Sequence, residues 1–217
     1  MPVSLHVWRV PRRRIGSALL RMALPRPRLP FVKFLGTATG FRSSDADLSR
    51  YAAVTVSSSP VSFPGWNRIA DAHARVDLLP LHSRGTWSGR KPFEPTTSSP
   101  GGMVLALTRA RLRPAAAMRF WRAVPAVVRE LEGTPGLLAG FGIGEAPIVW
   151  QGTVSVWRDA ADLARFAYRQ PEHRAVIART PVDRWYAEEL FARFAVLDIS
   201  GDRGVLGFSS AAMEGGR

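Results

Sequence analysis

Short stretches of alternating hydrophobic and polar residues recur through the first part of the chain and predict β-strands. These strands cover residues 4–10, 31–40, 51–57 and about 77–81. Two helices are predicted between them, over residues 13–24, which a Pro-rich segment follows, and over 66–75, which Pro64 and Gly65 precede. The resulting order, β-α-β-β-α-β, is that of a ferredoxin-like unit.

The same order of elements returns after a loop over residues 83–102 that is rich in Gly, Pro, Ser and Thr. Further strands are predicted at residues 103–109, 136–144, 149–157 and 193–199. Helical segments are predicted at residues 114–131, 163–168, 171–180 and 185–191. From Gly201 the chain is rich in Gly and Ser, which predicts a mobile tail.

The pattern therefore predicts an α+β fold with two tandem ferredoxin-like halves, residues 1–95 and 96–200, and a flexible tail, 201–217. In each half the helices cover one face of an antiparallel sheet and leave the other face bare. Because two bare faces can cover each other, we expect a barrel-like pseudo-dimer. A pocket between the two sheets is the expected place for a ligand.

The composition and the missing motifs exclude several classes of catalytic and cofactor site. With 217 residues, 46% of them hydrophobic, the chain is long enough for a substantial core. It has no cysteine, which excludes disulfides, thiolate nucleophiles, iron–sulfur clusters and cysteine-ligated haem or zinc. It also lacks the G-x-S-x-G, Walker A, H-E-x-x-H and dinucleotide-binding motifs. The G-x-G-x-G run at residues 140–144 ends a strand, and it indicates close backbone packing rather than a nucleotide site.

The net charge of +13 comes mainly from the N-terminal region, whose first 44 residues hold eight arginines, one lysine and no acid. The segment RRRIGSALLRMAL predicts a basic amphipathic helix, which fits peripheral contact with a membrane as well as an ordinary solvated arginine face. Arg21 interrupts the apolar run and Pro25 follows it, so the segment does not fit a secretory signal. We therefore expect a cytoplasmic protein, with membrane association through this segment as an open alternative.

Oxidation chemistry in such a chain would require a cofactor. Haem needs one axial ligand, and histidine is the only good one that this composition leaves. His173 follows Pro171, which can begin a helix. Its imidazole is therefore a candidate haem and iron ligand, although an exposed helix histidine paired with a carboxylate would show the same pattern. Arg84, close to His82, is a candidate to hold haem propionates. Trp87 is a further candidate to contact the cofactor, and the alternative for this loop is packing between the halves.

The remaining histidines fit structural roles better. His6 alternates with Trp8 on the first predicted strand, and we expect a hydrogen-bonded core histidine rather than one that lines a site. His73 lies on the predicted helix 66–75, where a surface position is expected. The many aromatic residues of the second half would mostly be core, and a subset would suit the wall of a pocket for an apolar ligand.

Two longer motifs point to a family. They are W-S-G-x-x-P-F (Trp87–Phe93) and F-A-Y-x-x-P-E-H (Phe166–His173). Over about residues 4–200 the chain resembles the spheroidene monooxygenase family, acyclic-carotenoid oxygenases with a dimeric α+β-barrel type of fold. The resemblance implies a haem enzyme that introduces a keto group at C-2 of a carotenoid with molecular oxygen and an external electron donor such as a ferredoxin. It also implies His173 as the axial ligand. The short P-E-H segment resembles the proximal-histidine segment of haem aldoxime dehydratases.

The leading hypothesis is thus a haem-dependent monooxygenase for a small apolar substrate. Two alternatives stay open: a haem-dependent dehydratase for an N–O substrate, and a non-catalytic protein that binds an apolar ligand. Nucleic-acid binding is disfavoured, because the arginines cluster near one end without interleaved aromatic residues. A tandem chain can complete a barrel by itself, and pairing into a homodimer is compatible with it.

Overall fold

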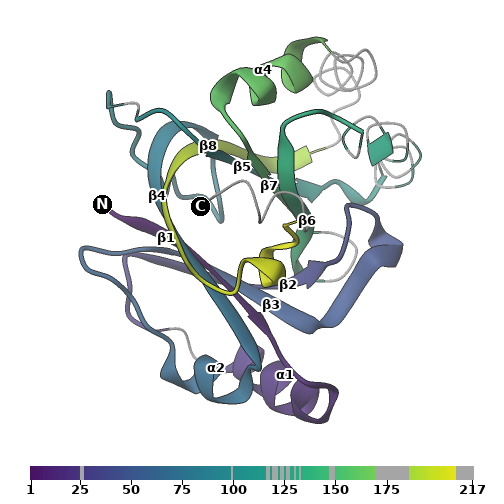
Figure 1. Cartoon of the computed structure of the whole chain (residues 1–217). Helices are drawn as coiled ribbons and strands as arrows, with labels where there is room; N and C mark the ends of the chain where they lie inside the picture. The colour runs from purple at the N-terminus through teal and green to yellow at the C-terminus, as the bar shows by residue number, and fades with distance from the viewer. Residues whose placement is uncertain are drawn as a thin grey trace.

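The computed structural model describes residues 1–24, 27–98, 100–115, 133–146, 150–169 and 186–208, with positions 118, 122, 125, 128, 129 and 131 between them. In this described part, eight antiparallel strands close into a barrel (Figure 1). The strands are β1 (Val3–Arg9), β2 (Phe31–Ala38), β3 (Ala46–Val56), β4 (Ala72–Gly85), β5 (Val104–Leu112), β6 (Leu137–Ala146), β7 (Trp150–Trp157) and β8 (Tyr186–Gly201).

The barrel is built from two ferredoxin-like sheets. Around it the strands follow the order β1-β3-β2-β6-β7-β5-β8-β4. The first half contributes β4-β1-β3-β2 and the second contributes the equivalent series β8-β5-β7-β6. They join where β4 pairs with β8 and where Gly36 and Thr37 of β2 pair with β6. The predicted α+β pseudo-dimer is therefore confirmed, and the link between the halves is the segment from β4 to β5.

Helices cover the outer face of each sheet. In the first half they are α1 (Ile15–Ala23), after the 3-10 turn η1 (Arg12–Arg14), and α2 (Pro64–Ile69). They pack on an aromatic cluster of Trp8, Phe34, Tyr51, Phe63 and Trp66. In the second half α4 (Ala160–Arg169) and the described helical positions between 114 and 131 cover Val104, Ala106 and Trp157.

The barrel interior is filled by apolar side chains. Alternate residues of the strands point inward because successive side chains of a strand face opposite ways. The interior cluster includes Leu5, Val54, Leu105, Phe141 and Phe194. Trp87 and Phe93, from the loop after β4, join the same cluster. The expected open pocket between the sheets is thus occupied by the protein's own side chains in the part of the chain that the structure describes.

Two predicted helices are partly strand. The helix predicted over 66–75 ends at Ile69, and β4 begins at Ala72, where Trp8 pairs with His73 and Val7 with Ala74. The segment predicted as a helical turn at 185–191 belongs, from Tyr186, to β8, because it pairs with β5 up to Leu112. In both places the strand ladder outweighs local helix propensity. The predicted helical turn at 171–180 lies outside the described residues.

The tail is packed for longer than predicted. After β8 the chain forms the 3-10 turn η3 (Arg203–Leu206), in which the Asp202 side chain accepts a hydrogen bond from the Gly204 N–H. Val205, Leu206 and Phe208 are buried in the interior cluster. The prediction of a mobile tail is therefore wrong for residues 201–208. Positions 209–217 lie outside the described residues.

The glycine run of β6 is explained by crowding, as the sequence indicates. A Cβ at Gly140 would lie 2.4 Å from the Phe41 ring, and one at Gly142 would lie 3.1 Å from the Gly40 carbonyl oxygen. Gly142 also donates its N–H to that carbonyl. The glycines therefore let the segment after β2 pass directly over β6.

Candidate functional site

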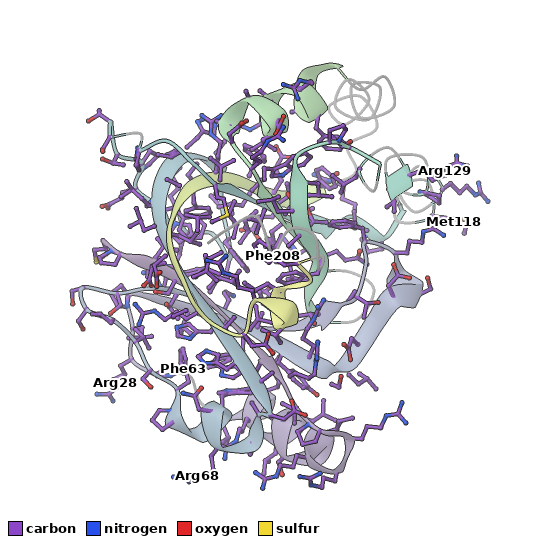
Figure 2. The ribbon with its side chains drawn as sticks, viewed as in Figure 1. Arg28, Phe63, Arg68, Met118, Arg129 and Phe208 are labelled. Atoms are coloured by element: carbon purple, nitrogen blue, oxygen red, sulfur yellow. The ribbon has the colours of Figure 1, made fainter. Side chains whose placement is uncertain are left out.

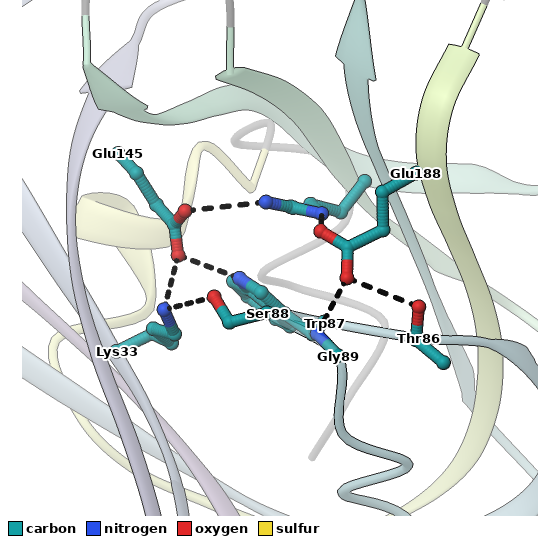
Figure 3. Close-up of polar contacts among 8 residues, drawn as sticks. Lys33, Thr86, Trp87, Ser88, Gly89, Glu145 and Glu188 are labelled. Atoms are coloured by element: carbon teal, nitrogen blue, oxygen red, sulfur yellow. Dashed lines mark hydrogen bonds and ion pairs between the residues drawn. The ribbon is translucent and has the colours of Figure 1, made fainter.

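A group of charged side chains, which includes Glu145 and Glu188 (Figure 3), lies around the buried Arg109 of β5. The Arg109 side chain is only 2% exposed, and its guanidinium contacts two carboxylates from different strands. Its Nη2 lies 3.3 Å from Oε2 of Glu145, on β6, and its Nη1 contacts Oε2 of Glu188, on β8. Arg109 therefore bridges two strands that are not neighbours in the barrel.

Lys33 of β2 completes the charge balance. Its Nζ lies 3.0 Å from Oε1 of Glu145 and donates a hydrogen bond of 2.7 Å to the Ser88 hydroxyl. Two cations, Lys33 and Arg109, thus face two anions, Glu145 and Glu188. Buried charges are tolerated when each is paired and hydrogen-bonded in this way.

The loop after β4 closes this end of the barrel. The Trp87 side chain is fully buried, and its Nε1–H donates a 2.6 Å hydrogen bond to Glu145. Glu188 accepts hydrogen bonds from the Gly89 N–H at 2.7 Å and the Thr86 hydroxyl at 3.0 Å. The turn requires positive φ at Ser88 (54°) and Gly89 (71°). The two carboxylates therefore hold the W-S-G turn over the barrel.

These contacts fix the protonation state of Glu188. Burial raises the pKa of Glu188. Hydrogen bonds from Gly89, Arg109 and Thr86, together with the Arg109 charge, outweigh burial and lower the pKa to about 2. Glu188 is therefore ionised at neutral pH and does not act as a proton donor there. Next to Trp87, the space lined by Leu35, Ile143 and Gly152 has no room for a water molecule. In the described part of the chain, Lys33, Arg109, Glu145 and Glu188 form a closed network of ion pairs rather than an open active site. We call these four residues the charged clamp.

A second polar group lies on the outer face of the first half. A cavity of about 210 Å³ is lined by His6, Phe63, Asn67, His73 and Arg75, among others. His6 Nδ1 lies 3.2 Å from His73 Nε2, and the two rings are parallel within 5°. One imidazole must donate and the other accept. Among the described residues, no cluster of three or more His, Asp or Glu side chains is placed to hold a metal ion.

The histidine pair is held in the neutral form. Burial lowers the pKa of His6 to about 3, and the neighbouring His73 and Arg75 lower it in the same direction. Burial also lowers the pKa of His73, again with a contribution from Arg75. His6 is thus buried, as predicted for a core histidine, but it also lines the cavity, and its Nε2 has no hydrogen-bond partner among the described residues. His73 is half-buried on β4 and bonded to His6, so the predicted helical surface position is wrong.

The neutral His6 makes stability depend on pH. Its contribution is complete above the ordinary pKa of 6.5 and is lost as the pH falls toward 3, because the unfolded chain takes up a proton that the folded protein resists. Between about pH 7 and pH 5 we expect the wild-type protein to lose about 2 kcal/mol more unfolding free energy than a His6→Gln variant. Urea denaturation at each pH measures this difference. An exposed control, His82→Gln, should keep the wild-type slope, and equal slopes for all three proteins would contradict the assignment.

Of the residues predicted for haem binding, the structure describes Trp87 and Arg84, and these two point to different places. Trp87 points into the barrel, whereas the Arg84 side chain is 72% exposed and lies 3.4 Å from Glu189. His82 is exposed, and its ring lies 6.1 Å from that of Phe191. His173, the predicted iron ligand, lies outside the described residues.

Sequence reasoning missed the charged clamp. The sequence pattern assigned no role to Lys33, Arg109, Glu145 and Glu188. Lys33 nevertheless stands within the otherwise apolar segment FVKFL, and Arg109 follows the inward-facing Leu105 and Leu107 at the same spacing of two residues. A charge at an inward-facing strand position is a signal, since it must find a partner once buried. Which partner it finds depends on strands far away in the sequence.

Comparison with known proteins assigns the family. No family model matches the sequence. The chain is 34% identical over 190 residues to the spheroidene monooxygenase of Rhodobacter capsulatus, covering 81% of this chain and 78% of that protein. It is 31% identical over 190 residues to the spheroidene monooxygenase of Rubrivivax gelatinosus, covering 82% and 73%.

A solved aldoxime dehydratase in complex with butyraldoxime shares the fold, with a TM-score of 0.51, 10% identity, and coverage of 91% of this chain and 79% of that chain. Because this identity is low, the likeness supports the architecture alone. The sequence identity extends over most of both chains and carries the assignment. This chain belongs to the spheroidene monooxygenase family of oxidoreductases.

Proposed function

We propose that this protein is a haem-dependent monooxygenase that introduces a keto group into an acyclic, carotenoid-like substrate. It would use molecular oxygen and an external electron donor such as a ferredoxin. The observation that carries the proposal is the 34% identity over 190 residues to a protein named spheroidene monooxygenase. The aromatic and apolar composition suits a substrate of this kind.

The described residues do not fit haem inside the barrel. Apolar side chains and Trp87 fill the interior, and Arg84, the predicted propionate anchor, is exposed and paired with Glu189. His6 and His73 bond each other, and His82 is exposed. We therefore assign no reaction step to the clamp residues. His173, four residues beyond the end of α4, remains our candidate for the iron ligand.

A visible absorption spectrum tests the haem and its ligand. The protein is expressed with a haem precursor, beside His173→Ala and the exposed control His82→Ala. Because an axial imidazole governs the spectrum of the iron, we expect a Soret band in the wild type, its loss or shift in His173→Ala, and no change in His82→Ala. A wild-type protein without a Soret band would exclude the haem, and an unchanged band in His173→Ala would exclude that ligand.

Substrate assays then separate the reaction classes. Incubation with an acyclic carotenoid, oxygen and a reduced ferredoxin should yield a ketone whose oxygen derives from molecular oxygen. Conversion of an aldoxime without added electrons would instead favour the dehydratase alternative. Tight binding of the carotenoid without turnover or haem would favour a ligand-binding protein.

A further inference from the structure

The outward face of α1 is apolar. Toward the sheet, α1 buries Ala18 and packs Met22 against the aromatic cluster of the first half. On its other sides Leu19 and Leu20 are 51% and 64% exposed, and Leu24, just after the helix, is 47% exposed. A surface helix normally has charged or polar residues on its outer face. The apolar outer face of α1 therefore indicates a partner.

Arginines lie on the turn that precedes α1 and on the helix next to it. Arg12 and Arg13 of η1 are exposed at the start of α1, and Arg68 is exposed on the neighbouring α2. The Arg14 guanidinium donates a 2.7 Å hydrogen bond to the Arg68 carbonyl oxygen, which ties the two segments together. Figure 2 shows Arg68 and Arg28 at the end of the molecule where Figure 1 places α1 and α2. Neither η1, α1 nor α2 contains an acidic residue.

We propose that this α1–α2 surface, defined by Arg12, Arg13, Leu19, Leu20, Leu24 and Arg68, docks on an anionic lipid membrane. Exposed leucines can enter the boundary between headgroups and acyl chains, while the arginines contact lipid phosphates. The docking is peripheral, because no helix among the described residues is long and apolar enough to cross a bilayer.

The chemistry of the surface disfavours two other occupants. Nucleic acid would use the arginines, but it offers no apolar phase for the three leucines. A second copy of the chain would bring two arginine-rich surfaces together, and these would repel each other. A membrane satisfies both the apolar and the charged residues. The proposal requires neither haem nor carotenoid, so it stands or falls independently of the proposed function.

Co-sedimentation of the full-length protein with vesicles tests the proposal. We expect binding to vesicles of phosphatidylcholine mixed with phosphatidylglycerol, and much weaker binding to phosphatidylcholine alone. The double variant Arg12→Gln/Arg13→Gln should bind the anionic vesicles about 30-fold more weakly, since each basic residue near the surface contributes about 1 kcal/mol. The double variant Leu19→Ser/Leu20→Ser should bind the anionic vesicles roughly tenfold more weakly than the wild type, because it loses the apolar contact.

A matched control distinguishes vesicle binding through this surface from binding through any exposed leucine. The variant Leu197→Ser removes a leucine that is 57% exposed on β8, a strand that pairs with β4 and β5, and it should bind like the wild type. Circular dichroism verifies that each variant is folded. Three results would overturn the proposal: no binding of the wild type to anionic vesicles, equal binding by the Leu19/Leu20 variant, or a dimer in solution that this variant dissociates. Preference for duplex DNA over the vesicles would likewise replace the membrane with nucleic acid.

Discussion

We expect the Arg109→Met variant to lose about 3–5 kcal/mol of unfolding free energy, because it leaves buried charges without their partner. In the folded protein the Arg109 guanidinium contacts both Glu145 and Glu188, whose side chains are only 11% and 12% exposed. Methionine fills a similar volume without the charge. Glu145 would keep Lys33, whereas Glu188 would keep, among the described residues, the neutral donors of Thr86 and Gly89. Urea denaturation at neutral pH measures the loss.

The pH dependence of this variant identifies the cause. In the wild type the stability contributed by Glu188 is complete above the ordinary carboxyl pKa of 4.5 and is lost as the pH falls toward about 2. Without Arg109 the pKa of Glu188 rises, so the deficit of the variant should shrink as the pH falls below 4.5. The control Arg111→Met removes an exposed arginine from the same strand and should change stability by less than about 0.5 kcal/mol. A loss below about 1 kcal/mol for Arg109→Met would contradict the clamp.

The second large effect is expected at Trp87. The Trp87→Ala variant should lose about 3–5 kcal/mol of unfolding free energy, because it leaves a cavity in the barrel interior. Trp87→Phe should lose less, about 1–3 kcal/mol, since one ring remains, although the variant loses the Nε1–H donor to Glu145 and leaves a smaller cavity. Urea denaturation again gives both values.

The neighbouring Lys91→Ala variant serves as the control, because Lys91 is exposed in the same loop and should be close to neutral. If Trp87→Ala were as stable as Lys91→Ala, the loop would not be part of the core. The W-S-G motif therefore has a direct structural role: its tryptophan fills the barrel, and its turn binds both carboxylates of the clamp.

The sequence by itself determined the order of elements and the two-half organisation. Strands β1, β2, β6 and β7 begin and end within two residues of their predicted bounds. The sequence also showed the basic amphipathic helix α1 and the crowded glycine run of β6, since both depend on residues that are close in sequence. Family membership followed from two local motifs and agrees with the identity to known relatives.

Only the tertiary structure decided the rest. β4 begins at Ala72 because it pairs with β1, and residue 186 onward is strand because it pairs with β5, although local propensity favours helix in both places. The charged clamp joins four residues that lie far apart along the chain, Lys33, Arg109, Glu145 and Glu188, and Trp87 donates a hydrogen bond to it. Strand pairing, charge pairing and the filling of the barrel are contacts between distant segments, and no periodicity in the sequence specifies which segments will meet.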